Sequence, residues 1–290
     1  MELSVWKNSG QFFDWKGHSI FFQDTAGTGQ PSAGMPVLLL IHGFPTSSYD
    51  FHLIWPELAK THRLIAFDML GYGYSSKPST WQHSIFNQAD IAGALLRHKG
   101  ISRCALITHD VGDTVGQEIL ARHAEGQLGF EIEQVVMLNG GLFPETHRAI
   151  LAQKLLLSRL GFLFTRLMKK SKLRASLRKV CSAGLSEGDI DAAWELMQHG
   201  QGNLKMHLLI QYMRERRENR DRWVQALQKA SMPFTLIDGV EDPISGEHMV
   251  QRFEELVPGK KTVRLEGLGH YPHLEDSGRT LAALKPFLEP

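Results

Sequence analysis

Residues 108–113, which read THDVGD, constrain the fold of this chain more than any other segment. The apolar residues 105–107 before them are typical of a buried strand, and Val111, Val115 and Ile119 after them recur at helical spacing. The pattern therefore predicts a strand, a sharp turn and a helix, with Asp110 in the turn. Such a turn holds its middle residue exposed on strained backbone, as in a nucleophile elbow.

An aspartate in that turn predicts a particular chemistry. A carboxylate can attack an electrophilic carbon and form an ester, which a base-activated water must then hydrolyse. His270 follows the last predicted strand and Asp242 follows the strand before it, so both are expected at the same edge of the sheet as Asp110. We predict Asp110 as the nucleophile, His270 as the base and Asp242 as the acid that orients the base. Asp238 and Glu241 lie close in sequence and stay open as alternatives to Asp242.

Strand-like and helix-like segments alternate over most of the chain. The pattern predicts strands at residues 19–22, 37–41, 64–67, 105–107, 134–138, 234–237 and 262–265, with a turn-rich stretch at 27–34. Alternation of this kind favours a mainly parallel sheet covered by helices. It stops at about residue 141 and resumes at about residue 233, and the stretch between is helical in character. We therefore predict a core formed by residues 1–140 and 231–290, interrupted by a helical cap at 141–230.

Further candidate residues surround this triad. Residues 42–45, which read HGFP, follow the predicted strand 37–41, so the Phe44 N–H can lie beside the Val111 N–H and stabilise an oxyanion. Three side chains are candidates for contact with the substrate or the leaving group: Tyr212, His42 and Trp194. His147 is a weaker candidate of the same kind. No His, Cys, Asp or Glu residues have metal-ligand spacing, and the glycine-rich residues 68–75 match no phosphate loop, so we predict neither metal nor cofactor.

Composition excludes several classes of function. The net charge of the 290 residues is +1, which gives no general attraction to nucleic acid. The two cysteines, Cys104 and Cys181, do not indicate a disulfide framework and suit a reducing compartment. The N-terminal residues have no apolar run of signal-peptide length, and residues 37–41 are far too short to span a membrane. We expect a cytoplasmic protein without an integral membrane segment, and the sequence leaves the oligomeric state open.

One part of the predicted cap has an unusual charge pattern. From Thr146 to Ser186 there is no Asp or Glu, but there are ten Lys and Arg residues among many leucines and phenylalanines. This pattern fits either a lid that turns its apolar side toward the site or a basic amphipathic surface for membranes. We favour the lid and keep peripheral membrane contact as the alternative.

These motifs together resemble the α/β-hydrolase superfamily, and the His-Asp-x-Gly elbow is similar to its branch of epoxide hydrolases and haloalkane dehalogenases. A closer resemblance is to the mesoderm-specific transcript protein family. It covers roughly residues 36 to 285 and rests on residues 42–50, 109–113, 139–148, 202–204, 211–212, 222–224 and 270–272. The resemblance implies an α/β-hydrolase fold, in which helices flank a mostly parallel eight-stranded sheet and a helical cap follows the sixth strand. It also implies the Asp110, Asp242 and His270 triad.

The chain departs from each known branch at the leaving group. Epoxide hydrolases usually carry two lid tyrosines, whereas the predicted cap has only Tyr212. Haloalkane dehalogenases usually place a Trp after the nucleophile to hold the halide, and here that residue is Val111. We therefore predict hydrolysis of a small lipophilic epoxide to a diol. The alternatives are haloalkane or haloacid dehalogenation and a ligand-binding homologue without turnover.

Overall fold

The protein is described by a computed structural model that covers residues 1–26, 34–80 and 82–288, so the turn-rich stretch predicted at 27–34 lies almost wholly outside the described residues. A single sheet holds eight strands in the order β1-β2-β4-β3-β5-β6-β7-β8. Their bounds are β1 Gln11–Trp15, β2 His18–Asp24, β3 Val37–Ile41, β4 Arg63–Phe67, β5 Arg103–His109, β6 Glu131–Leu138, β7 Phe234–Gly239 and β8 Lys261–Leu265. Strands β3 to β8 pair in parallel and β1 and β2 form an antiparallel edge, which confirms the predicted fold class.

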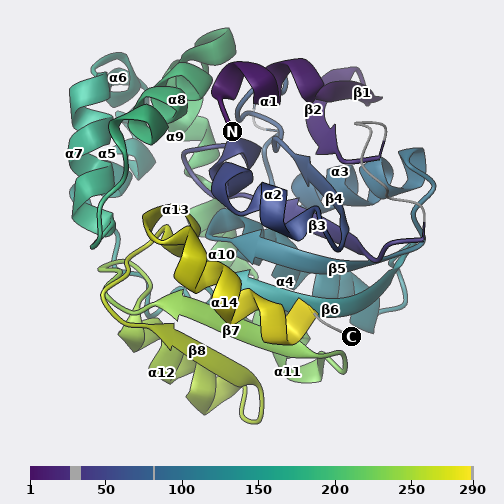
Figure 1. The fold of residues 1–290 in the computed structure, drawn as a ribbon. Helices are drawn as coiled ribbons and strands as arrows, with labels where there is room; N and C mark the ends of the chain where they lie inside the picture. The colour runs from purple at the N-terminus through teal and green to yellow at the C-terminus, as the bar shows by residue number, and fades with distance from the viewer. Residues whose placement is uncertain (27–33, 81, 289–290) are drawn as a thin grey trace.

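The central strands are apolar throughout because helices cover both faces of the sheet. In β3, Leu39 and Ile41 join the core cluster on one face, while Leu38 and Leu40 join the cluster on the other. The first face is covered by α3 (Ile85–His98), α4 (Val111–Ala124), α11 (Arg220–Lys229) and α12 (Glu247–Leu256). The second face is covered by α1 (Leu3–Ser9), the 3-10 helix η1 (Ser48–Leu53), α2 (Trp55–Leu58) and α14 (Ser277–Leu288), the yellow helix in front of the sheet in Figure 1.

A helical insertion separates β6 from β7, as predicted, and Figure 1 shows its teal-green helices at one end of the sheet. Besides α11 it contains α5 (Leu151–Leu157), α6 (Gly161–Arg166), α7 (Lys170–Val180), α8 (Glu187–Gln198), η2 (His199–Lys205), α9 (Met206–Leu209) and α10 (Tyr212–Glu218). Ser186 caps α8 by accepting a hydrogen bond from Asp189 N at 3.1 Å. The last helix, α11, packs along α4 of the core, and the boundaries at residues 140 and 231 stay predictions.

The orientation of the cap differs from the favoured interpretation. We expected the apolar residues of the acid-free stretch to face the site, and Leu156 does so. Leu160, Phe162, Leu163 and Leu167 instead are 43–55% exposed. That expectation is therefore wrong for α6 and its flanks, because this six-residue helix packs inward through its small residues. None of the helices in the described residues is both long and apolar enough to cross a membrane.

Candidate active site

Asp110 lies in the turn between β5 and α4, where its backbone has φ 49° and ψ −105°. This region is unfavourable for a residue with a side chain, so the surrounding packing must hold it. Gly112 permits the turn, since a Cβ there would lie 2.1 Å from the carbonyl oxygen of Ile41 at the end of β3. The first turn of α4 thus rests directly on β3, and this close approach places the Asp110 side chain at the carboxyl ends of the parallel strands.

The loop after β3 approaches the same carboxylate. A Cβ at Gly43 would lie 2.6 Å from the Asp110 Cβ, so only glycine allows this approach. The Phe44 N–H donates a hydrogen bond to Asp110 Oδ2 at 2.9 Å, and the Tyr271 hydroxyl donates to the Phe44 carbonyl oxygen at 3.1 Å. Of the two predicted oxyanion donors, Phe44 therefore already donates a hydrogen bond to Asp110, the predicted nucleophile. Val111, the second predicted donor, directly follows Asp110 as the first residue of α4.

His270 connects Asp110 to Asp242. Its Nε2 lies 4.0 Å from Asp110 Oδ2, and its Nδ1 lies 2.7 Å from Asp242 Oδ2. Asp242 also accepts hydrogen bonds from the Ile244 N–H and the Ser245 hydroxyl, both at 2.8 Å. Burial works to raise the pKa of Asp242, but the His270 charge and these donors outweigh it and hold that pKa below its usual value. The carboxylate form is thus favoured, which suits a residue that orients an imidazole.

The alternative acids lie elsewhere. The Asp238 carboxylate is fully buried and makes no hydrogen bond with the described residues, and burial raises its pKa well above the usual value. Glu145, a further carboxylate in the resemblance motif 139–148, binds Arg220 and Arg252 on the surface. Asn139, which directly follows β6, donates to the Gly239 carbonyl oxygen at 3.0 Å and lies 3.4 Å from Asp242 Oδ2. Among these positions, the structure brings Asp242 to the histidine.

The protonation of His270 depends on its two carboxylate neighbours. Burial alone would lower its pKa, but the charges of Asp242 and Asp110 raise it to about 9. In this arrangement the imidazole is therefore protonated at neutral pH. Forming an ester at Asp110 would remove one of these charges and so lower the pKa of His270. His270 could then lose its proton and act as the base when the Asp110 ester is hydrolysed.

Tyr212 begins α10 and is 2% exposed. Its hydroxyl is buried and makes no hydrogen bond of normal geometry with the described residues, although the Gln153 amide is near enough to affect its pKa. Burial, together with the Asp110 charge, raises the pKa of this phenol, while the Arg216 guanidinium lowers it. The Tyr212 ring contacts the Phe44 ring with centroids 5.9 Å apart. Tyr212, which the sequence analysis named as a candidate, therefore lies near the predicted nucleophile Asp110, and its hydroxyl has no hydrogen bond to the described residues.

Arg216 is the main residue of the site that sequence reasoning missed. It is 2% exposed, its Nη2 donates to the Asp110 carbonyl oxygen at 3.0 Å, and the same atom lies 3.5 Å from Asp110 Oδ1. Its Nε donates to the Thr114 hydroxyl at 2.7 Å, and its guanidinium carbon lies 4.6 Å from the centre of the Tyr212 ring. Helical spacing places residue 216 one turn after Tyr212, and this was the only signal in the sequence.

The other candidates from the sequence are placed less favourably. His42 uses both ring nitrogens, one against the Gly43 carbonyl oxygen at 2.8 Å and the other as acceptor for Met69 N at 3.0 Å, so neither is free for a substrate. Trp194 is half-buried and packs against the core cluster. Both ring nitrogens of His147 are buried without hydrogen bonds to the described residues. Burial and the neighbouring Arg216 charge lower the pKa of His147 to about 4, so its ring is neutral.

A pocket connects this site to the cap. From the core it is lined by Phe44, Pro45, Ile244, His270 and Tyr271. From the cap it is lined mainly by apolar side chains: Ile150, Ala152, Gln153, Leu156, Met168, Leu173, Ser176, Leu177, Val180, Met197 and Met206. The pocket therefore reaches Phe44 and His270, two of the residues that approach the Asp110 carboxylate. Its lining suits a small lipophilic substrate.

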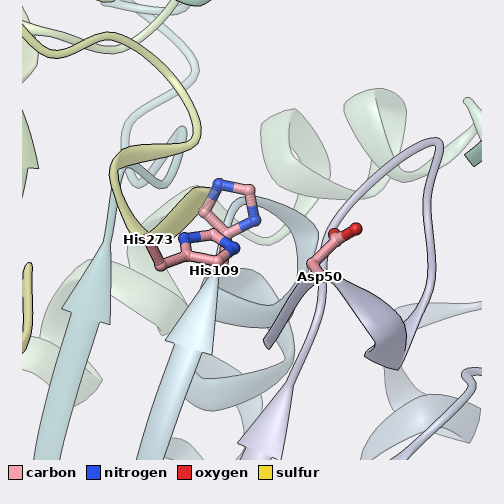
Figure 2. Close-up of side chains that lie close together, drawn as sticks. All are labelled: Asp50, His109 and His273. Atoms are coloured by element: carbon pink, nitrogen blue, oxygen red, sulfur yellow. The ribbon is translucent and has the colours of Figure 1, made fainter. Parts of the chain in front are cut away.

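A second polar cluster lies behind the triad. Figure 2 shows His109 and His273 with Asp50 beside them, and their ligand-type atoms lie within 4.8 Å of one another. Burial lowers the pKa of His109 to about 4 and that of His273 well below its usual value, and it raises the pKa of Asp50. The His109 ring contacts that of His270 with centroids 5.2 Å apart, so this cluster packs against the predicted base. The sequence-based prediction of no metal rests on spacing along the chain, which cannot detect such a cluster, and it stays a prediction.

Comparison with known proteins agrees with this geometry at the level of the class. The profile of the alpha/beta hydrolase fold family matches residues 36–277, and the chain belongs to this family of hydrolases. The mouse mesoderm-specific transcript protein is 40% identical, covering 99% of this chain and 88% of the mouse protein.

Two further proteins are more distantly similar. Epoxide hydrolase 3 of Xenopus tropicalis is 31% identical over 44% of this chain and 35% of its own length. The crystal structure of haloalkane dehalogenase DbeA from Bradyrhizobium elkani superposes with a TM-score of 0.78 at 21% identity, covering 97% of this chain and 98% of that one. The second likeness supports the fold alone.

Proposed function

We propose that this α/β-hydrolase opens a small lipophilic epoxide to a diol through an ester formed on Asp110. The observation that carries the proposal is the Tyr212 hydroxyl, which is buried near Asp110 and has no hydrogen bond to the described residues. Asp110 also lies close to His270, which Asp242 orients. An epoxide needs both partners, since its carbon must be attacked while its oxygen receives a proton. The similarity to epoxide hydrolase 3 adds support.

The first step alkylates the enzyme. An Asp110 oxygen attacks an epoxide carbon, the carbon–oxygen bond of the ring breaks, and the Tyr212 hydroxyl protonates the released oxygen. The Arg216 guanidinium over the Tyr212 ring stabilises the phenolate that remains.

The second step hydrolyses the ester. Once ester formation has lowered its pKa, His270 releases its resting proton to solvent. The neutral imidazole then takes a proton from a water whose oxygen attacks the Asp110 carboxyl carbon, and the Phe44 N–H holds the oxyanion. When the bond between that carbon and the alkyl oxygen breaks, His270 returns this proton to the leaving alcohol. The remaining water proton goes to Tyr212 as Asp110 regains its charge, and His270 takes a proton back from solvent. The net reaction adds one water to the epoxide.

Dehalogenation of a small haloalkane or haloacid remains the second candidate, and one observation favours it. Neither Val111 nor Phe44 offers a side-chain donor for a halide, but Arg216 places a guanidinium 3.5 Å from Asp110 Oδ1. Halide departure needs such donors and no proton. Both candidates use the same nucleophile and base.

Single turnover in oxygen-18 water tests the shared chemistry. Water attacks the ester carbonyl, so label should enter the Asp110 carboxylate, where peptide mass spectrometry detects it. Label found only in the product would mean direct attack of water on the substrate and would refute the ester. A panel of styrene oxides and haloalkanes, read as diol and as halide, then separates the two candidates.

We also propose a cytoplasmic location. Both cysteines are buried free thiols, which suits a reducing compartment. Fractionation of the cells that express the natural gene tests this location directly.

A further inference from the structure

The outer surface of the cap carries an unusual concentration of exposed apolar side chains. Nine large hydrophobic residues are exposed in the described part of the chain, and five of them lie between residues 151 and 167. These five are Leu151, Leu160, Phe162, Leu163 and Leu167, with 43–71% of each residue exposed. Single exposed leucines are normal on a soluble protein, but a cluster of this kind marks an interaction surface. We call these five residues the cap patch.

Packing explains why the cap patch faces outward. Helix α6 buries Gly161 and Thr165, and a Cβ at Gly161 would lie 2.0 Å from the Leu156 carbonyl oxygen. The small residues of α6 thus face the body of the cap, so Phe162 and Leu163 point away from it. In Figure 1 α5, α6 and α7 form the outer edge of the molecule. This helix face has no partner within the described chain.

Charge indicates what covers the cap patch. Lys154, Arg159, Arg166 and Lys169 are exposed among or beside its residues, and none of them has a carboxylate within 4.0 Å in the described residues. The basic residues of the stretch that do form ion pairs lie on α7, where Lys170 binds Asp191 and both Arg174 and Arg178 bind Glu187. Exposed basic residues without carboxylate partners, interspersed along the chain with exposed apolar side chains, match a surface that is negative outside and apolar beneath.

The same helices also line the substrate pocket. Helix α5 presents Gln153 and Leu156 to the pocket while Leu151 and Lys154 face outward, and α7 contributes Leu173 and Leu177 to the pocket. A partner surface bound to the outer side of these helices would therefore be separated from the apolar pocket lining by one layer of helices. We propose that the cap patch docks the protein on a lipid bilayer that contains anionic lipid, with the phenylalanine and leucine side chains in the interface and the four basic residues at the headgroups. This inference concerns binding alone and does not depend on the proposed chemistry.

Flotation of the full chain with vesicles tests the proposal. We expect the protein to float with vesicles of phosphatidylcholine and phosphatidylserine, and binding to phosphatidylcholine alone should be at least about tenfold weaker, given four basic residues at the surface. High salt should release the protein, because it screens the charge attraction. Failure to float with the anionic vesicles at low salt would overturn the proposal.

Two variants and one matched control locate the surface. The double variant Phe162→Ser with Leu163→Ser, and separately Arg159→Gln with Arg166→Gln, should each weaken flotation about tenfold or more. Phe12→Ser removes a side chain that is 56% exposed on β1, far from α6 in sequence, and should bind like the wild type. All of these residues are exposed, so circular dichroism melting should report an unchanged fold. Equal flotation of all variants would mean that another surface binds the membrane and would refute the proposed role of the cap patch.

A second copy of the chain is the competing occupant. Light scattering of the free protein distinguishes it, because the proposal expects the Phe162→Ser and Leu163→Ser variant to have the same mass in solution as the wild type. If the wild type is a dimer that does not bind vesicles, and this variant is a monomer, then the cap patch joins two copies of the chain. That result would refute the proposal that the cap patch binds a bilayer.

Discussion

The core and the cap contribute different halves of the candidate site, and they hold their residues in different ways. The core half consists of Asp110, His270 and Asp242 with the Phe44 amide, and direct hydrogen bonds fix most of these groups at the ends of strands. The cap half consists of Tyr212 and Arg216, and its Tyr212 hydroxyl makes no hydrogen bond of normal geometry with the described residues. A fully bonded group is positioned before substrate arrives, whereas an unbonded donor is available to it.

In the mechanism that we propose, this difference assigns the two halves to different steps. The core half supplies the base and the oxyanion donor, which serve hydrolysis of the ester. The cap half supplies the proton donor and a positive charge, which serve formation of the ester. Substitutions of His270 or Asp242 should therefore leave an alkylated enzyme, and substitutions in the cap should leave an unmodified one.

The largest effect is expected from His270→Gln. This variant keeps the nucleophile but loses the base, so turnover should fall by about a thousandfold or more while one equivalent of substrate stays on Asp110. Intact-mass spectrometry should detect the adduct, and peptide mapping should place it. An inactive variant without adduct, tested with a substrate that the wild type turns over, would remove His270 from the second step.

Asp242→Asn should give the same adduct with a smaller accumulation, because the imidazole remains but loses the carboxylate 2.7 Å away that orients it. Asp238→Asn is the matched control, since that carboxyl is buried on β7, the strand that Asp242 follows, and makes no hydrogen bond to His270. Full activity of Asp242→Asn would point to another acid.

The next effect concerns the cap. Tyr212→Phe should reduce epoxide turnover by about a hundredfold, the contribution of one general acid, and no adduct should accumulate. Tyr74→Phe is the matched control because its hydroxyl is also buried without a hydrogen bond to the described residues, but its ring contacts Phe21 and His199 whereas that of Tyr212 contacts Phe44. Epoxide opening at the wild-type rate would mean that Tyr212 only packs, and halide release by a wild type that ignores epoxides would favour the second candidate.

The sequence predicted the core half far better than the cap half, and the reason is physical. Chain order and strand ends determine where Asp110, Asp242 and His270 meet, because parallel strands end at one edge of a sheet. The side chains of a short helical insertion depend on how each helix is rotated, and α6 is too short for its periodicity to show that Phe162 faces outward. Arg216 was missed for the same reason, since it lies in a run of charged residues that reads as a solvated face. The edge strand β1 was also missed, because Gln11–Trp15 pairs antiparallel at the rim outside the alternating pattern.

A smaller effect separates the two roles of the cap. Arg216→Met removes the charge that stabilises the Tyr212 phenolate, and a rise of one unit in the pKa of that phenol would slow epoxide opening about tenfold. Arg217→Met is the control, since its side chain is exposed on the same helix. The loss should be greatest for epoxides whose released oxygen is most basic, as a series of substituted styrene oxides would measure. A uniform loss across the series would indicate that Arg216 positions α10 without affecting the leaving group.

The last test concerns the charge on His270 and needs no substrate. Its pKa is raised from about 6.5 in the unfolded chain to about 9 in the folded protein, so its protonation adds stability that is complete below the lower value. This contribution should disappear as the pH rises through about 9. We expect the difference in free energy of unfolding between the wild type and His270→Gln, measured by urea denaturation, to decrease across that window. A constant difference would mean that the imidazole is neutral in the free enzyme, and His270 would then be ready as a base before Asp110 is esterified.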